Sequence, residues 1–168
     1  MTVMSHPTLS RARLLVPLTL ANGVAVSSLY WGQAVVARAA GEFGGSATVS
    51  LVPGAALAGY AMGVAGLATL AGDLTEPGGL ARHFLLLVAA LCLAASAPVA
   101  SVLTVACLLV GIGCALTQRL LASATSAVGS GARAQTIGWI IAGGLCGIVL
   151  ARAAVPAAAS SLGWRGVF

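Results

Sequence analysis

The segment from Thr48 to Ala71 reads TVSLVPGAALAGYAMGVAGLATLA. It contains no charged side chain, and it is longer than the roughly 20 helical residues that cross the hydrocarbon core of a bilayer. The rest of the chain has the same character, because 60% of all residues are hydrophobic and only 7% are charged. About a quarter of the residues in a soluble domain are charged. The sequence therefore predicts an integral membrane protein whose main surroundings are the lipid bilayer.

Five apolar runs approach or reach the length of a membrane span. We place these spans at residues 14–36, 48–71, 80–97, 101–121 and 135–155. Only a short link from Pro98 to Ser101 separates the third run from the fourth, so these two should form an antiparallel hairpin. The predicted fold is all-α, a polytopic bundle of about five transmembrane helices over residues 14–168. A polar tail precedes it at residues 1–13, and a sixth span is expected to start near residue 165.

The arginines indicate the orientation and exclude one class of partner. Cytoplasmic loops carry an excess of basic residues, and Arg11 and Arg13 directly precede the first span. We therefore predict a cytoplasmic N-terminus. The net charge is +5, but the arginines are scattered singly, whereas a nucleic-acid-binding protein clusters them on one face. The absence of lysine beside abundant alanine and glycine indicates a GC-rich bacterial gene, and hence the bacterial inner membrane.

Polar residues inside the predicted spans are candidate contacts for a substrate. Asn22, Tyr30 and Gln33 fall within about 80° on one face of the first span, taking about 100° per residue. Gln118 is the strongly polar member of the fourth span, and Arg152 lies near the outer end of the fifth. Polar side chains at membrane depth face the bundle interior or a water-filled cavity. The alternatives are interhelical hydrogen bonding for the polar residues and, for Arg152, extension of its charge to the bilayer surface.

Small residues at a spacing of four indicate where helices approach one another closely. The second span contains Gly59 and Gly63, and the fifth contains Gly143 and Gly147. We predict that these four glycines lie at helix contacts. The alternative is chance in a chain rich in glycine and alanine.

The sequence shows no signature of enzyme, metal or cofactor chemistry. It has no paired carboxylates, no Ser-His-Asp set and no phosphate-binding loop. Its four cysteines sit inside apolar runs and have no histidine at the spacing of a zinc site. We expect a protein that is not an enzyme and that needs no metal and no cofactor.

Several short motifs occur in an order known from one family of membrane proteins. Ser28-Leu29-Tyr30-Trp31-Gly32-Gln33 is similar to N-I-Y-Y-N-Q-P near the end of that family's helix one, and Glu42-Phe43-Gly44 follows at a similar distance. Gly59-Tyr60-Ala61-Met62-Gly63 resembles G-Y-A-L-G in helix two, and Gly72-Asp73-Leu74 resembles the loop after it. Gly147-Ile148-Val149-Leu150-Ala151-Arg152 resembles G-I-L-L-A-R in helix five, and Gly163-Trp164-Arg165 resembles the G-W-R before helix six. The ordered set resembles the major facilitator superfamily, particularly its bacterial drug and sugar efflux branch.

The chain departs from the family pattern at three places. Ala34 stands where the family has a proline after the glutamine. The basic cluster that should follow the loop aspartate is replaced by Pro77, Gly78 and Gly79, which leaves Arg82. Cys107 occupies the position four residues before Gly111 where many members have an arginine.

The resemblance implies the N-terminal half of a secondary-active transporter that exports small organic molecules, cut short before helix six. Such a half works with a C-terminal half, which would be missing here, and the substrate site lies between the two. The predicted substrate-cavity residues are Asn22, Tyr30, Gln33, Gln118 and Arg152. The predicted gating loop consists of Asp73 with Arg82 or Arg133. Two other functions stay open: a small dimeric transporter of another family, and a non-transporting membrane subunit or remnant.

Overall fold

The structure, a computed structural model, describes residues 8–69, 79–115 and 130–168. These residues form helices and turns, and no strand occurs among them. The elements are α1 (Thr8–Glu42), η1 (Ala47–Leu51), α2 (Val52–Thr69), α3 (Gly79–Ala95), α4 (Ala100–Ala115), α6 (Ser130–Leu162) and η2 (Arg165–Val167), where η denotes a 3-10 helix.

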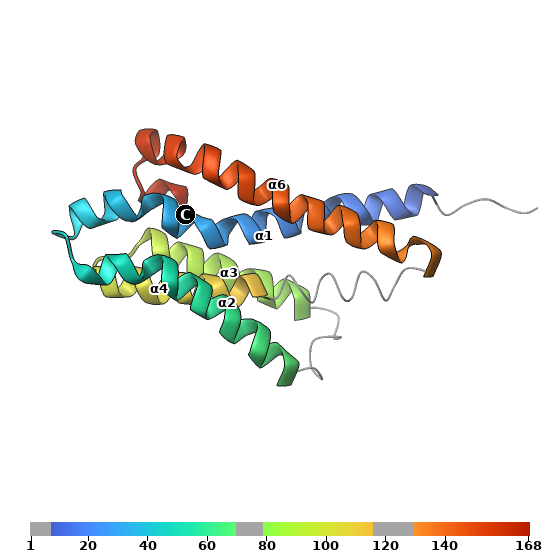
Figure 1. Ribbon diagram of the computed structural model, residues 1–168, viewed down its shortest axis with the longest axis horizontal. Coiled ribbons are helices and arrows are strands. Elements are labelled where there is room, and N and C mark those ends of the chain that lie inside the picture. Colours follow the sequence, from blue (N-terminus) through green and yellow to red (C-terminus); the bar gives the residue numbers. More distant parts are fainter. Residues whose placement is uncertain (1–7, 70–78, 116–129) are drawn as a thin grey trace, which may run out of the picture.

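The helices form two closely packed pairs that α1 joins together. α1 packs along α6, α2 packs along α4, and α1 also contacts both α2 and α4 (Figure 1). α3 forms an antiparallel hairpin with α4. The end of α1, the turn between α3 and α4, and the C-terminal turn meet at one end of the bundle (Figure 1). We call this end, which holds residues 42–46, 96–99 and 163–168, the Glu42 end.

Glycine and proline set where the helices stop at the Glu42 end. Gly44 and Gly45 follow α1 with φ values of 66° and 71°, a left-handed conformation that glycine adopts without a steric penalty. Gly45 N–H then donates to the Ala40 carbonyl at 2.8 Å and closes the end of the helix. Gly163, with φ of 76°, ends α6 in the same way. Pro98 follows α3 and disfavours helical geometry in the residue before it.

Two helices are longer than the predicted spans. α1 begins before residue 14 and extends past residue 36 to Glu42, so Arg38 lies in the helix and not in a loop. α6 continues through Pro156 to Leu162, whereas the predicted span ended at residue 155. A proline is tolerated inside a membrane helix when the freed backbone groups find other partners. The predicted start of a sixth span near residue 165 is a single turn of 3-10 helix.

Two stretches among the described residues are long and apolar enough to cross a bilayer, namely Ala47–Gly66 and Arg133–Leu162. Shorter apolar helices cover His83–Ala95 and Ala100–Ala115. The predicted ends of the second and fourth spans, at residues 71 and 121, lie outside the described residues. The number of spans therefore stays a prediction.

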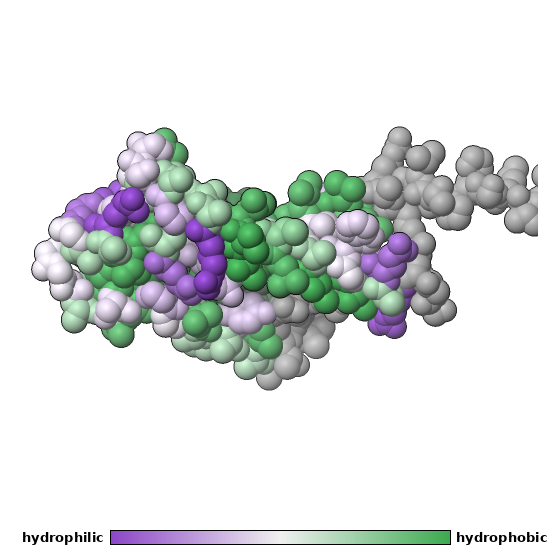
Figure 2. Space-filling view, turned by 45° about the horizontal axis from the view of Figure 1, so that its top comes forward, coloured by the Kyte–Doolittle hydropathy of each residue, from purple (hydrophilic) through white to green (hydrophobic). Residues whose placement is uncertain are grey.

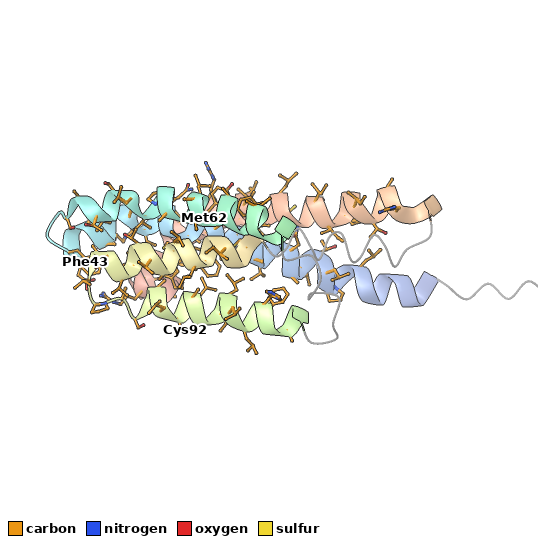
Figure 3. All side chains as sticks on the ribbon, turned by 90° about the horizontal axis from the view of Figure 1, so that it is seen from below. Phe43, Met62 and Cys92 are labelled. Atoms are coloured by element: carbon orange, nitrogen blue, oxygen red, sulfur yellow. The ribbon has the colours of Figure 1, made fainter. Side chains whose placement is uncertain are left out.

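The interior of the bundle consists mainly of small side chains, and large apolar side chains point outward. Ala25, Val35 and Ala106 are fully buried, while Leu85 and Val149 are 68% and 66% exposed. On the face in Figure 2, hydrophilic residues gather at the Glu42 end and near the start of α6, and the surface between them is largely hydrophobic. In Figure 3, Phe43 lies at the Glu42 end, and the exposed Met62 and Cys92 lie along α2 and α3. This distribution suits a bundle whose middle is surrounded by lipid.

Candidate functional site

Tyr30 and Arg152 meet where α1 packs against α6. The guanidinium carbon of Arg152 lies 5.5 Å from the centroid of the Tyr30 ring, which is within the range of a cation–π contact. Arg152 is exposed, and Tyr30 is half-buried. Gln33, one helical turn further along α1, is also half-buried, and its side chain forms no hydrogen bond with the described residues. Two of the predicted cavity residues are therefore in contact, and a third lies one turn away.

Asn22 has a different environment from Tyr30 and Gln33. It is 8% exposed, and its Nδ2 donates a hydrogen bond of 2.8 Å to the Ile140 carbonyl of α6. It also lies about 12 Å along α1 from Tyr30, given a rise of about 1.5 Å per residue. In the structure Asn22 thus makes the interhelical hydrogen bond that was the alternative interpretation of this position.

The four predicted packing glycines lie where helix backbones approach one another. A Cβ on Gly59 would overlap the Leu108 carbonyl of α4, and one on Gly63 would lie 2.5 Å from the Ala115 Cβ. A Cβ on Gly143 would lie 2.5 Å from the Thr19 carbonyl oxygen of α1. A Cβ on Gly147 would overlap the Gly23 carbonyl of α1, and one on Gly111 of α4 would overlap the Ala56 carbonyl of α2. Both helix pairs therefore leave no room for a methyl group at these positions.

The remaining predicted residues are placed only in part. Gln118 and Asp73 lie outside the described residues, so their roles stay predictions. Arg82 belongs to α3. Arg133 is exposed in the first turn of α6. Arg133 forms no ion pair with a carboxylate of the described residues.

An apolar groove of about 480 Å³ lies between α1 and α6. Trp31 of α1 and Leu150 of α6 line it. Gln33 and Arg152 each come two positions later, which is about 200° around a helix with 3.6 residues per turn. Neither of them, nor Tyr30, lines the groove. The groove of the α1–α6 pair is thus mainly apolar, and Tyr30, Gln33 and Arg152 do not line it.

A second polar cluster, at the Glu42 end, was not predicted as a site. Arg165 Nη1 lies 2.5 Å from each carboxylate oxygen of Glu42, and its Nη2 donates to the Ala97 carbonyl at 3.0 Å. Trp164 Nε1 donates to Glu42 Oε2 at 2.6 Å. The Arg165 guanidinium carbon also lies 4.2 Å from the Trp164 ring centroid and 5.9 Å from that of Phe43. This cluster joins the end of α1, the turn after α3 and the C-terminal turn.

The motifs quoted from the sequence contain these residues but do not show that they contact one another. Glu42 and Phe43 belong to one quoted motif, and Trp164 and Arg165 belong to another. More than 120 positions separate Glu42 from Arg165, and no local pattern connects residues so far apart. The contact arises because α1 and α6 both end toward the same end of the bundle (Figure 1).

The Glu42 carboxylate makes stability depend on pH. Hydrogen bonds from Arg165 and then Trp164 hold the pKa of Glu42 below its ordinary value of 4.5. A carboxyl group with a depressed pKa stabilises the folded state above the ordinary value, and this contribution is lost as the pH falls below 4.5 toward the folded-state pKa. The effect should be modest, because both side chains are partly exposed and solvent screens exposed ion pairs.

We expect the thermal midpoint of the purified protein to fall as the pH is lowered below 4.5. In Glu42→Gln the carboxylate is absent, so this fall should be shallower. Circular dichroism melting of both proteins across a series of pH values measures the difference. Identical slopes in the two proteins would contradict a stabilising Glu42–Arg165 pair.

Comparison with known proteins connects this bundle to transport. The chain is 32% identical over 157 residues to the uncharacterized transporter YgaY of Escherichia coli O157:H7, and it matches the protein of that name in strain K12 to the same extent. The match covers 92% of this chain but only 40% of each relative. No family model and no solved structure matches the chain. The chain is therefore a distant homologue of part of a protein named as a transporter.

Proposed function

We propose that this chain forms the N-terminal part of a secondary-active transporter of the major facilitator type, which exports small organic molecules across the bacterial inner membrane. The observation that carries this proposal is the homology to a transporter along 92% of the chain. The apolar exterior and the two described stretches that are long enough to cross a bilayer support it. The export direction and the family follow only from the motif resemblance.

The geometry supports a rigid half that moves as one body. α1 with α6, and α2 with α4, meet through glycine contacts that leave no space for side chains. In alternating access, one bundle rocks against another around a central site. The side of the α1–α6 pair that carries Tyr30, Gln33 and Arg152 would face that site, joined by Gln118 of the predicted fourth span. Asp73, Arg82 and Arg133 would form the gating loop.

A second half is needed to complete such a site. The chain spans 40% of the length of the relatives it matches, so more than half of a relative lies outside the match. We propose that further helices of this kind, corresponding to a C-terminal half, supply the opposite wall of the cavity.

A chimera tests the proposed function. Residues 1–168 are expressed in an efflux-deficient Escherichia coli strain either alone or in place of the matched part of YgaY. We expect the chimera to lower the accumulation of at least one compound in a panel of drugs and sugars, and the chain alone to lower none. Gln33→Ala in the chimera should reduce this export.

Saturable flux by residues 1–168 alone, abolished by Gln33→Ala, would instead support the small dimeric transporter. No flux from either protein would favour the non-transporting subunit.

Orientation can be tested with residues from opposite ends of the bundle. Ala47 follows α1 at the Glu42 end, and Ala134 lies in the first turns of α6 at the other end; both are exposed. In a variant without native cysteines, we expect an impermeant thiol reagent to label Ala47→Cys in intact cells. Ala134→Cys should be labelled only after the membrane is opened. The reverse pattern would show that the N-terminus is outside.

A further inference from the structure

Arg152 carries a charge that no described carboxylate neutralises. Within the described residues the one ion pair joins Arg165 to Glu42. The other two carboxylates of the chain, Asp73 and Glu76, lie outside the described residues. They belong to the predicted loop on the cytoplasmic side, whereas Arg152 is predicted near the outer end of its span. A charged side chain within a membrane helix requires a partner or a water-filled cavity.

The structure holds the Arg152 guanidinium in a defined place. Its central carbon lies 5.5 Å from the centroid of the Tyr30 ring, which is within the range of a cation–π contact. Neither Arg152 nor Tyr30 lines the apolar groove. Arg152 is exposed, so a ligand can reach its guanidinium group.

The neighbouring polar groups are also hydrogen-bond donors. The Tyr30 hydroxyl and the Gln33 side-chain amide can each donate hydrogen bonds, and the guanidinium has five N–H groups. Gln33 has no hydrogen-bond partner among the described residues. Arg152, Tyr30 and Gln33 together offer many hydrogen-bond donors and one positive charge, without an acidic residue. Such a group is complementary to an oxyanion. The planar fork of arginine binds a carboxylate or phosphate through two parallel hydrogen bonds.

We propose that Arg152, stacked on Tyr30 and flanked by Gln33, binds the oxyanion of the transported molecule, so that the substrates are organic acids bearing a carboxylate or phosphate. The assignment rests on the proposed transport function. The same chemistry occurs in the phosphate of a lipid headgroup, which is the other source of an oxyanion at this depth.

Binding measurements separate charge from shape. Purified residues 1–168 are placed in phosphatidylcholine nanodiscs, and benzoate is compared with benzamide, which has a similar shape but no charge. Tryptophan fluorescence reports binding, because Trp31 adjoins Tyr30 in the sequence. We expect benzoate to bind and benzamide to bind more weakly. Arg152→Gln should raise the Kd for benzoate on the order of tenfold, the change that loss of about 1.4 kcal/mol produces.

Two further variants keep the test specific. Arg38→Gln removes another exposed arginine of the same membrane region that has no described partner, and its Kd should equal that of the native protein. Arg152→Lys keeps the charge but loses the planar fork, so it should give an intermediate Kd. Far-ultraviolet circular dichroism and the melting midpoint confirm that each variant is folded. An unchanged Kd in a folded Arg152→Gln protein would overturn the proposal.

A lipid arm distinguishes the two sources of oxyanion. Native mass spectrometry counts phosphatidylglycerol molecules retained by the native protein and by Arg152→Gln. Loss of lipid retention without any benzoate binding would assign Arg152 to headgroups and overturn the substrate assignment. Benzoate binding needs no flux, so it can succeed even if the chimera fails to transport. Conversely, the chimera could transport while Arg152→Gln binds benzoate as tightly as the native protein does. That result would overturn the oxyanion site at Arg152 and leave the proposed transport function standing.

Discussion

Replacing Gly59 with leucine should separate α2 from α4 and strongly destabilise the bundle. A Cβ at this position would overlap the Leu108 carbonyl, which is backbone and cannot rotate away as a side chain does. Overpacking of a filled interior costs about 1–3 kcal/mol, and sometimes more. Gly111 of α4 meets the Ala56 carbonyl in the same way, so the two helices are in close backbone contact at both positions. We expect a lower yield of monodisperse protein in detergent and a lower melting midpoint.

Gly54 provides the matched control on the same helix. A Cβ there would have no atom within 4 Å, and the residue is exposed. Gly54→Leu should therefore leave yield and melting midpoint close to those of the native protein. Size-exclusion chromatography and thermal melting of both variants compare a close contact with an open position in one helix. Equal behaviour of Gly59→Leu and Gly54→Leu would refute the claim that the α2–α4 contact depends on Gly59.

The sequence predicted the helical class and the presence of the main helices, because both depend on local properties. A charge-free run such as residues 48–71 must satisfy its backbone hydrogen bonds internally at membrane depth, and the structure has helix through most of it. Helix ends were predicted less well. Arg38 and Pro156 were assigned to connecting segments, yet α1 and α6 run through them. Local hydropathy does not reveal these extensions, because Arg38 and Pro156 interrupt the apolar runs.

The candidate site was predictable only as separate residues. Helical periodicity placed Asn22, Tyr30 and Gln33 on one face of α1. It could not show that Asn22 would bond to the Ile140 carbonyl while Tyr30 would meet Arg152. These outcomes depend on how α6 is aligned along α1, which close approach at residues such as Gly147 fixes.

Replacing Arg165 with alanine should release the C-terminal turn and expose Trp164, which is 5% exposed in the structure. Arg165 contacts both Glu42 oxygens, the Ala97 carbonyl and two aromatic rings. Its removal therefore frees three segments at once. The ion pair is partly exposed and adds little by itself, so the main result should be local opening and not global unfolding.

Trp164 can report this opening once Trp31 and Trp139 are replaced by phenylalanine, because these are the other two tryptophans of the chain. In Arg165→Ala we expect its emission to shift to longer wavelength and its quenching by iodide to increase severalfold, since a buried indole becomes accessible to water.

Arg38→Ala, which removes an exposed arginine one helical turn before Glu42, is the control and should change neither quantity. Arg165→Lys keeps the positive charge but cannot contact Glu42, Ala97 and both rings with one planar group, so it should give intermediate quenching. Equal quenching in Arg165→Ala and Arg38→Ala would mean that packing of Trp164 against Phe43, with ring centroids 5.7 Å apart, holds the turn without the arginine.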